Sequence, residues 1–294
     1  MNLPKTPIFI YPERQQLFHH STFFSLENLK YSTRKFLHRK AVQKFETMVN
    51  KQELWKMFFR HNPYACYTVL HSYASKHFTP QQRVEALETD LSSALIHFGE
   101  TSCEQVFCQN KPLKLAQLTD DIALYLHKND LCLLEALWSV SLRDKEMNRL
   151  YNCTFVFLSQ SEILLTSVQG GGSKAEVRDL TKQLHGLRPM QLMVNIMQLF
   201  ASHLGCTALY GIPQNLQVKL RRFKRNHVLF SYDDFWQEFA GKKQHNPIRP
   251  FFILPLSATR KAFDEISSKK RAIYRRRYQM LDQASAAILT FLSK

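Results

Sequence analysis

The segment from Pro189 to Leu204 carries apolar side chains around nearly its whole helical circumference. Other elements must cover a helix of this kind on several sides. It falls short of the roughly 20 apolar residues that a membrane-spanning helix needs, and polar residues interrupt it. We therefore expect it to be the central buried helix of a domain. Its apolar residues are Met190, Leu192, Met193, Val194, Ile196, Met197, Leu199, Phe200 and Leu204, and its polar ones include Gln191, Asn195, Gln198 and His203.

Helical periodicity dominates the chain before about residue 110. The clearest example is the helix expected from Pro80 to Phe98, with Thr79 as its N-cap and Gly99 as its end. Apolar residues recur there at steps of three and four, while acidic residues lie off that stripe. Further helices are expected at Ser25 to Asn50, Gln52 to Arg60 and Pro63 to Lys76.

After Leu113 the pattern changes to short apolar runs separated by turn signals. These runs predict a meander of antiparallel strands: LKLAQL, IALYLH, CLLEALWSVSL, LYNCTFVFL and EILLTSVQG. The elements expected after the meander are helices at Lys174 to His185 and Pro189 to Leu204, a strand at Cys206 to Ile212, a helix at Tyr232 to Ala240, a strand at Phe251 to Leu256 and a helix at Ser267 to Leu292.

Together these elements predict an α+β protein. An N-terminal helical region would occupy residues 1–110, and a domain with a mixed sheet and packed helices would occupy residues 111–294. The order of meander, buried helix, strand, helix and last strand resembles that of Gcn5-related N-acetyltransferase (GNAT) folds. This resemblance concerns topology alone, so it implies a fold by analogy and does not by itself assign an activity.

Positive charge is concentrated in the C-terminal third of the chain. The 294 residues include 40 Lys and Arg against 24 Asp and Glu, a formal net charge of +16, and residues 217–277 account for +11 of it. Such a field attracts polyanions, for example nucleic acid, an anionic membrane surface or a phosphorylated molecule. Nucleic acid is the least favoured of these partners, because no recognised nucleic-acid-binding module accompanies the charge.

The first residues lack the cationic segment and apolar run of a secretory signal. Six cysteines are scattered without a paired framework, which is typical of a reducing compartment. We expect a cytoplasmic protein without a transmembrane segment, whose contact with the inner membrane would be peripheral.

The chain resembles the VirK/YbjX family of Gram-negative bacteria in the segments EALWSVSLRDKEMNRLYNCTFVF, LTKQLHGLRPMQLM, YDDFWQEFAGKK and SKKRAIYRRRYQMLD. The resemblance covers most of the chain and is strongest from residue 135 onward. It implies a link to virulence, envelope integrity and resistance to antimicrobial peptides. It implies no catalytic residue, because no biochemical activity is established for the family.

A candidate anion site precedes the buried helix. Gly186, Leu187 and Arg188 lie where free backbone N–H groups and the positive end of the helix dipole can hold a phosphate. Acetyltransferase-like folds bind the pyrophosphate of coenzyme A at this place. The alternative is a plain helix break, in which Gly186 ends one helix and Pro189 begins the next. The loop lacks a second and third glycine, which favours anions in general over coenzyme A.

A second glycine-rich site follows the last strand of the meander. Gly170 and Gly171, with Gly172, either allow a ligand to approach the backbone closely or form a flexible surface loop. No Lys-Ser or Lys-Thr pair follows them, so the segment is not a P-loop.

The final helix contains six cations within nine residues, which point all around its axis. Lys270, Arg275 and Arg277 are the candidates for binding an anion or a partner, because Lys270 and Arg277 lie beside the apolar stripe and Arg275 belongs to the same cluster. Arg276 faces away from the stripe, as a solvated charge would. A further basic cluster, RRFKR at Arg221 to Arg225, is interpreted as an exposed loop.

Two functions remain open at this point. The first is an acyltransferase-like enzyme that uses acyl-coenzyme A or another phosphorylated acyl carrier, with Tyr210 or Asn215 orienting the acyl group or protonating the leaving thiolate. The second is a non-enzymatic envelope-related regulator or chaperone-like factor that binds anionic lipid or acidic partners through the basic C-terminal third. Neither the histidines nor the cysteines have the spacing of a zinc site, and no metal is expected.

Overall fold

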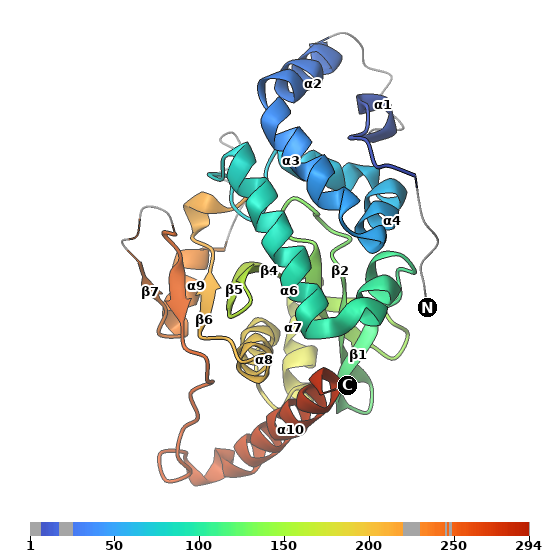
Figure 1. The fold of residues 1–294 in the computed structure, drawn as a ribbon. Coiled ribbons are helices and arrows are strands. Elements are labelled where there is room, and N and C mark those ends of the chain that lie inside the picture. Colours follow the sequence, from blue (N-terminus) through green and yellow to red (C-terminus); the bar gives the residue numbers. More distant parts are fainter. Residues whose placement is uncertain (1–6, 18–25, 220–229, 245, 247–248, 294) are drawn as a thin grey trace.

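The structure is a computed structural model that describes residues 7–17, 26–219, 230–244, 246 and 249–293 (Figure 1). The basic cluster at 221–225 lies outside the described residues. The protein is α+β, with a mixed sheet of eight described strands in the order β1-β2-β3-β4-β5-β6-β8-β7. The strands are β1 (Leu113–Thr119), β2 (Ile122–Lys128), β3 (Trp138–Asp144), β4 (Arg149–Ser159), β5 (Glu162–Gly170), β6 (Ala208–Gly211), β7 (Lys242–Lys243) and β8 (Phe252–Leu254).

The antiparallel meander predicted from the sequence is confirmed. Each strand from β1 to β5 pairs antiparallel with the next, β5 pairs parallel with β6, and β8 pairs antiparallel with both β6 and β7. The parallel pair is joined by α7 (Lys174–Gln183) and α8 (Pro189–His203). Three strands are shorter than expected. β6 spans only Ala208–Gly211, β8 spans only Phe252–Leu254, and β3 begins only at Trp138, because the apolar residues before it form a loop.

The N-terminal region is helical, with three differences from the expected boundaries. The first long helix is divided at His38, which has φ −104° and ψ 22°. The helical segment that begins at Pro63 ends at Leu70 instead of Lys76. The helix from Pro80 continues past Gly99 to Phe107. The elements are α1 (Arg14–Leu17), α2 (Leu26–Leu37), α3 (Arg39–Asn50), α4 (Glu53–His61), η1 (Pro63–Cys66), α5 (Tyr67–Leu70) and α6 (Pro80–Phe107).

Gly99 explains why α6 bends without ending. Its φ of 73° and ψ of 162° are outside the helical region, and a positive φ is readily adopted by glycine. Helical geometry resumes on its far side, so the expected stop is a kink. The second half of α6 then places Phe107 against Trp55 of α4 and Trp138 of β3, at ring-centroid distances of 5.7 and 4.5 Å.

Helices α6 and α8 pack side by side on one face of the sheet (Figure 1). Phe98 of α6 contacts Trp138 of β3 at 5.0 Å and Phe200 of α8 at 5.9 Å, while Phe200 also contacts Phe155 of β4 at 5.7 Å. The expected central helix is therefore confirmed, since α8 is enclosed by the sheet and other helices. The remaining elements are η2 (Gln214–Leu216), α9 (Tyr232–Glu238) and α10 (Ser268–Leu292).

A buried carboxyl group connects α6 to the sheet. Asp90 accepts hydrogen bonds from the Tyr73 hydroxyl and from the backbone N–H of Phe157, at 2.8 Å for the latter. Asp90 has no solvent exposure, and burial raises its pKa from 3.8 to about 7. The Phe157 bond satisfies a β4 amide beyond the point where pairing with β3 ends.

We predict that Asp90→Asn removes part of the pH dependence of stability. Because the folded-state pKa is raised, native wild-type protein binds the proton more tightly, and its free energy of unfolding falls as the pH rises from about 4 to about 7. The loss approaches about 1.4 kcal/mol per pH unit between the two pKa values. Urea melts at several pH values in this range measure the free energy of unfolding, which should change less with pH for Asp90→Asn than for the wild type. The same pH dependence in both proteins would contradict the assignment.

The C-terminal helix α10 docks on α8 and β1, with Met280, Leu281, Ala284 and Ile288 buried. The Ser285 hydroxyl also lies 2.8 Å from His203 Nε2 of α8. The apolar stripe expected for this helix is therefore a packed interface, and Arg276 is exposed as expected.

Leu281→Ala should lower the free energy of unfolding by roughly 2 to 5 kcal/mol, because it removes a buried side chain from this interface. The control is Arg276→Ala on the same helix, which should change stability by no more than about 0.5 kcal/mol. Denaturant melts measure both values. Equal, small effects would mean that α10 is not docked in solution.

Candidate active site

The face of the sheet opposite α6 and α8 carries a buried polar cluster. Directly paired residues share a face, and the register aligns Ser139, Thr154 and Ser167 in one row across β3, β4 and β5. A neighbouring row aligns Ser141, Asn152 and Gln169. All of these except Gln169 are at most 1% exposed. Buried polar side chains in such number are unusual for a sheet and need hydrogen-bond partners.

Glu135 is the acidic member of the cluster. It lies in the loop between β2 and β3, which Asn129 holds by donating to the carbonyl oxygens of Cys132 at 2.7 Å and Ala136 at 3.0 Å. Glu135 Oε2 accepts from Ser167 Oγ at 3.1 Å and from Gln169 Nε2 at 3.2 Å. The loop therefore places the Glu135 carboxylate against Ser167 and Gln169 of β5.

Burial dominates the electrostatics of Glu135. Only 1% of the residue is exposed, and this desolvation raises the pKa of its carboxyl group, although Lys219 acts in the opposite direction. Lys219 Nζ lies 3.6 Å from Oε1, and its own side chain is 44% exposed. Within the described residues Oε1 receives no hydrogen bond, nor does Asn152 Nδ2 donate one. Oε1 is therefore ion-paired with Lys219 but keeps unused hydrogen-bonding capacity, as does Asn152 Nδ2, and the cluster meets solvent at Lys219 and Gln169.

The cluster lies where β5 and β6 part. Their pairing ends at Leu165 with Gly211, followed by one bond from Ile212 N–H to Leu165 O at 3.0 Å. Beyond that point the Tyr232 hydroxyl bonds to Val168, accepting from its N–H at 3.1 Å and donating to its carbonyl at 3.0 Å. A side chain therefore occupies the β5 edge that the diverging strand leaves free.

The residues before α8 occupy a turn that α10 contacts. Gly186 has a φ of 75°, and a Cβ at this position would lie 3.0 Å from Arg277 Nη2. Arg277 donates through Nε and Nη2 to the carbonyl oxygen of His185, at 3.2 and 3.0 Å. Leu187 is buried, and Arg188 pairs with Glu238 of α9 at 3.7 Å. The structure thus brings the predicted Gly186, Leu187 and Arg277 together.

The other predicted residues lie elsewhere. Tyr210 pairs in register with Leu164, on the face away from α8, and its hydroxyl donates to Glu162 at 3.1 Å. Asn215 is exposed in η2. A Cβ on Gly170 would overlap the Tyr151 ring at 2.3 Å, so close packing explains that glycine, whereas Gly171 faces open space.

Two of the predicted cations on α10 do not join the turn before α8. Lys270 is exposed, and Arg275 lies 5.9 Å from the centre of the Phe263 ring. No group of three or more potential metal ligands occurs in the part of the chain that the structure describes. There too, no helix is both long and apolar enough to cross a membrane.

Comparison with known proteins identifies the family. Residues 25–290 match the family described as protein of unknown function (DUF535). The chain belongs to this family. A DUF535 relative from Escherichia coli K12, the uncharacterized protein YbjX, is 34% identical over 121 residues, which span 39% of this chain and 35% of the relative. The VirK/YbjX resemblance inferred from the sequence is therefore confirmed.

Other relatives align over more of the chain. An uncharacterized protein of Haemophilus influenzae is 35% identical over 288 residues, which cover 95% of this chain and 97% of the relative. A protein of Mannheimia haemolytica named membrane protein LapB is 29% identical over 197 residues, covering 66% and 85% of the two chains. No solved structure matches this DUF535 protein.

Sequence reasoning missed Glu135 because the run CLLEALWSVSL was interpreted as one continuous strand. A single carboxylate among apolar residues is a signal, since an unpaired charge is rarely buried. Polar residues at every second position of the next strands, such as Ser139 with Ser141 and Asn152 with Thr154, are another.

We predict that Glu135→Gln raises the melting temperature at alkaline pH. The raised pKa of Glu135 makes wild-type stability fall as the pH rises above the ordinary value of 4.5, and glutamine removes that loss while keeping an acceptor for Ser167. The gain should shrink toward pH 4. Calorimetric melts between pH 4 and 9 measure it.

Glu162→Gln is the matched control on β5. Although burial raises it, the pKa of Glu162 is lowered overall by the hydrogen bond and charge of Arg249. Its loss should therefore reduce stability at neutral pH. A lower melting temperature for Glu135→Gln at every pH would mean that the Glu135 carboxylate is a structural element.

Proposed function

We propose that this DUF535 protein is an acyltransferase-like enzyme in which Glu135 is the proton acceptor. The observation that carries the proposal is the buried carboxylate of Glu135, which has a raised pKa and whose Oε1 receives no hydrogen bond from the described residues and contacts only the ammonium of Lys219 at 3.6 Å among the ion pairs described. The order of its elements supports the proposal, because an antiparallel meander, a crossover through α8 and a parallel strand that then diverges resemble the order of elements in GNAT folds. That likeness is an analogy of topology.

In the proposed reaction, the open Glu135 Oε1 accepts a proton from an amine or hydroxyl group of the acceptor substrate. A lone pair on the acceptor nitrogen or oxygen forms the new bond to the acyl carbon, and the electrons of the broken N–H or O–H bond remain on that atom. The carbon–sulfur bond of the thioester breaks, and the carrier leaves as a thiolate that takes up a proton. Asn152 Nδ2, an unused donor on the same face, can bind the acceptor or the acyl oxygen.

Phosphorylated carriers are proposed as acyl donors because Arg188 is available to them. The Arg188 side chain is 66% exposed, and that of Glu238, its ion-pair partner at 3.7 Å, is 45% exposed. Exposed pairs of this type contribute little, so a phosphate can displace the carboxylate. Tyr232 limits how a donor lies along β5, since its hydroxyl occupies both polar groups of Val168.

The test is thiol release from acetyl- and palmitoyl-coenzyme A in the presence of amine and hydroxyl acceptors, followed with a thiol-reactive dye. Wild-type protein should release thiol, with a rate that rises with pH through the raised pKa of Glu135. Glu135→Gln should slow release by about 100-fold or more, the usual contribution of a general base.

Glu162→Gln should leave thiol release nearly unchanged, because that carboxylate belongs to the Tyr210–Arg249 group outside the polar cluster. Arg188→Ala should raise the KM for the donor and leave kcat near the wild-type value. Equal rates for Glu135→Gln and wild type would contradict the proposal.

A further inference from the structure

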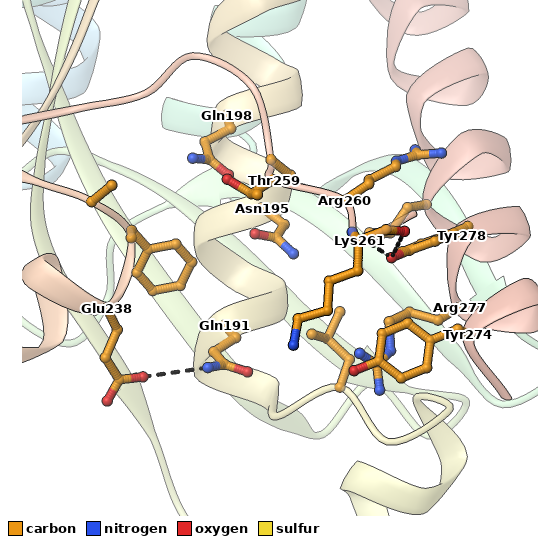
Figure 2. Close-up of a pocket in the computed structure, with 15 residues that line it drawn as sticks. Gln191, Asn195, Gln198, Glu238, Thr259, Arg260, Lys261, Tyr274, Arg277 and Tyr278 are labelled. Carbon is orange, nitrogen blue, oxygen red and sulfur yellow. Dashed lines mark hydrogen bonds between the residues drawn. The ribbon is translucent and has the colours of Figure 1, made fainter. Parts of the chain in front are cut away.

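A cavity of about 340 Å³ lies between α8 and α10 (Figure 2). Helix α8 packs on the face of the sheet opposite the Glu135 cluster. The end of α9 and the segment 258–261 complete the wall of the cavity. Its volume is in the range of small-molecule sites. The polar side chains that line it are Gln191, Asn195, Gln198, Glu238, Thr259, Arg260, Lys261, Tyr274, Arg277 and Tyr278.

One wall is a stripe of amides on α8. Gln191, Asn195 and Gln198 follow one another at steps of four and three, so they share one side of an otherwise apolar helix. Gln198 is only 2% exposed, and its Nε2 donates to the carbonyl oxygen of Pro255 at 2.9 Å. Its Oε1 is buried and receives no hydrogen bond from the described residues. An acceptor in this state indicates a missing donor.

The opposite wall is cationic and preorganised. Arg277 is fixed by its two bonds to His185 O and by the Tyr274 ring, whose centre lies 4.2 Å from the guanidinium carbon. Lys261 is held through its backbone, whose N–H donates to the Tyr278 hydroxyl at 3.0 Å while that hydroxyl donates to its carbonyl at 3.1 Å.

The Lys261 side chain extends into the cavity, where its ammonium group can bind a ligand. In Figure 2 it extends between Gln191 and Tyr274, and its ammonium group forms no ion pair with any described residue. Arg260, by contrast, is engaged with Asp282 outside. Two cations therefore converge from different elements on a space that also contains an open amide acceptor.

We propose that this cavity binds a small hydroxylated phosphate. The phosphate lies between Arg277 and Lys261, and a hydroxyl group donates to Gln198 Oε1 with Asn195 as a further polar contact. The rings of Tyr274 and Tyr278 cover the carbon chain of the ligand. The same chemistry occurs in a free polyol or sugar phosphate and in the headgroup of phosphatidylglycerol.

Titration calorimetry with glycerol 3-phosphate, glucose 6-phosphate and inorganic phosphate tests the proposal on the full chain. If the ligand is a soluble metabolite, we expect both hydroxylated phosphates to bind more tightly than inorganic phosphate. If the ligand is a lipid headgroup, we expect binding to vesicles that contain phosphatidylglycerol. Flotation with phosphatidylcholine vesicles, with and without phosphatidylglycerol, is the second arm. Binding of the soluble compounds alone assigns a metabolite, and binding of the phosphatidylglycerol vesicles alone assigns a lipid headgroup; either supports the site.

Lys261→Ala should weaken that binding at least about tenfold, the effect of losing a charge-assisted hydrogen bond. Lys269→Ala is the matched control, because Lys269 is an exposed lysine on α10 that does not line the cavity. Asn195→Ala should reduce the preference for the hydroxylated ligands over inorganic phosphate. None of these three variants should alter thiol release at Glu135, so the two proposals fail independently.

Three results would overturn the cavity proposal. These are an absence of binding in both arms, measurable binding of inorganic phosphate with the same affinity as the hydroxylated phosphates, and an equal effect of Lys261→Ala and Lys269→Ala. Unchanged circular dichroism and melting temperature of Lys261→Ala confirm that any loss of binding is local.

Discussion

The contact among Phe98, Trp138 and Phe200 is the junction on which the rest of the molecule depends. It joins the long N-terminal helix α6, the sheet and the central helix α8 in one aromatic cluster. Aromatic side chains bury large apolar areas, and edge-to-face pairs add specificity of geometry. Because Phe107 extends the cluster toward α4, the hydrophobic core continues from the helical region into the sheet.

This arrangement divides the sheet into two chemically different faces. One face directs large apolar side chains into the aromatic core, and α8 packs against it, while α10 packs on α8 and β1. The other face is freed from most of that packing, and its central strands carry hydroxyl and amide groups around Glu135. The polar groups on this second face are buried as well, and hydrogen bonds among them satisfy part of their bonding capacity.

Elements with strong periodicity were predictable from the sequence, as the meander, α8 and α10 demonstrate. Their patterns depend on local geometry alone. The loop before β3 was not predictable from the sequence. A short apolar run fits a strand or a buried loop equally well, and only tertiary contacts determine which of the two forms. Tertiary contacts also explain the difference at Gly99, where the sequence predicted the end of a helix and the structure has a kink within α6.

The candidate sites were harder to predict because each combines residues that are distant in sequence. Glu135 meets Ser167 only through the strand register, which the sequence leaves open. The amide stripe at Gln191, Asn195 and Gln198 is visible as spacing, but the cation facing it, Lys261, comes from a loop. The meeting of Gly186 with Arg277 likewise needs the docking of α10.

The hydroxyl of Tyr232 has a consequence for association between molecules. Where β6 leaves β5, the strand would present an unpaired edge to which a β-strand of another chain could add. By bonding both polar groups of Val168, a single side chain occupies the place of a neighbouring strand. The anchoring of α9 therefore also guards the sheet against edge-to-edge aggregation, a role that phenylalanine at this position would not perform.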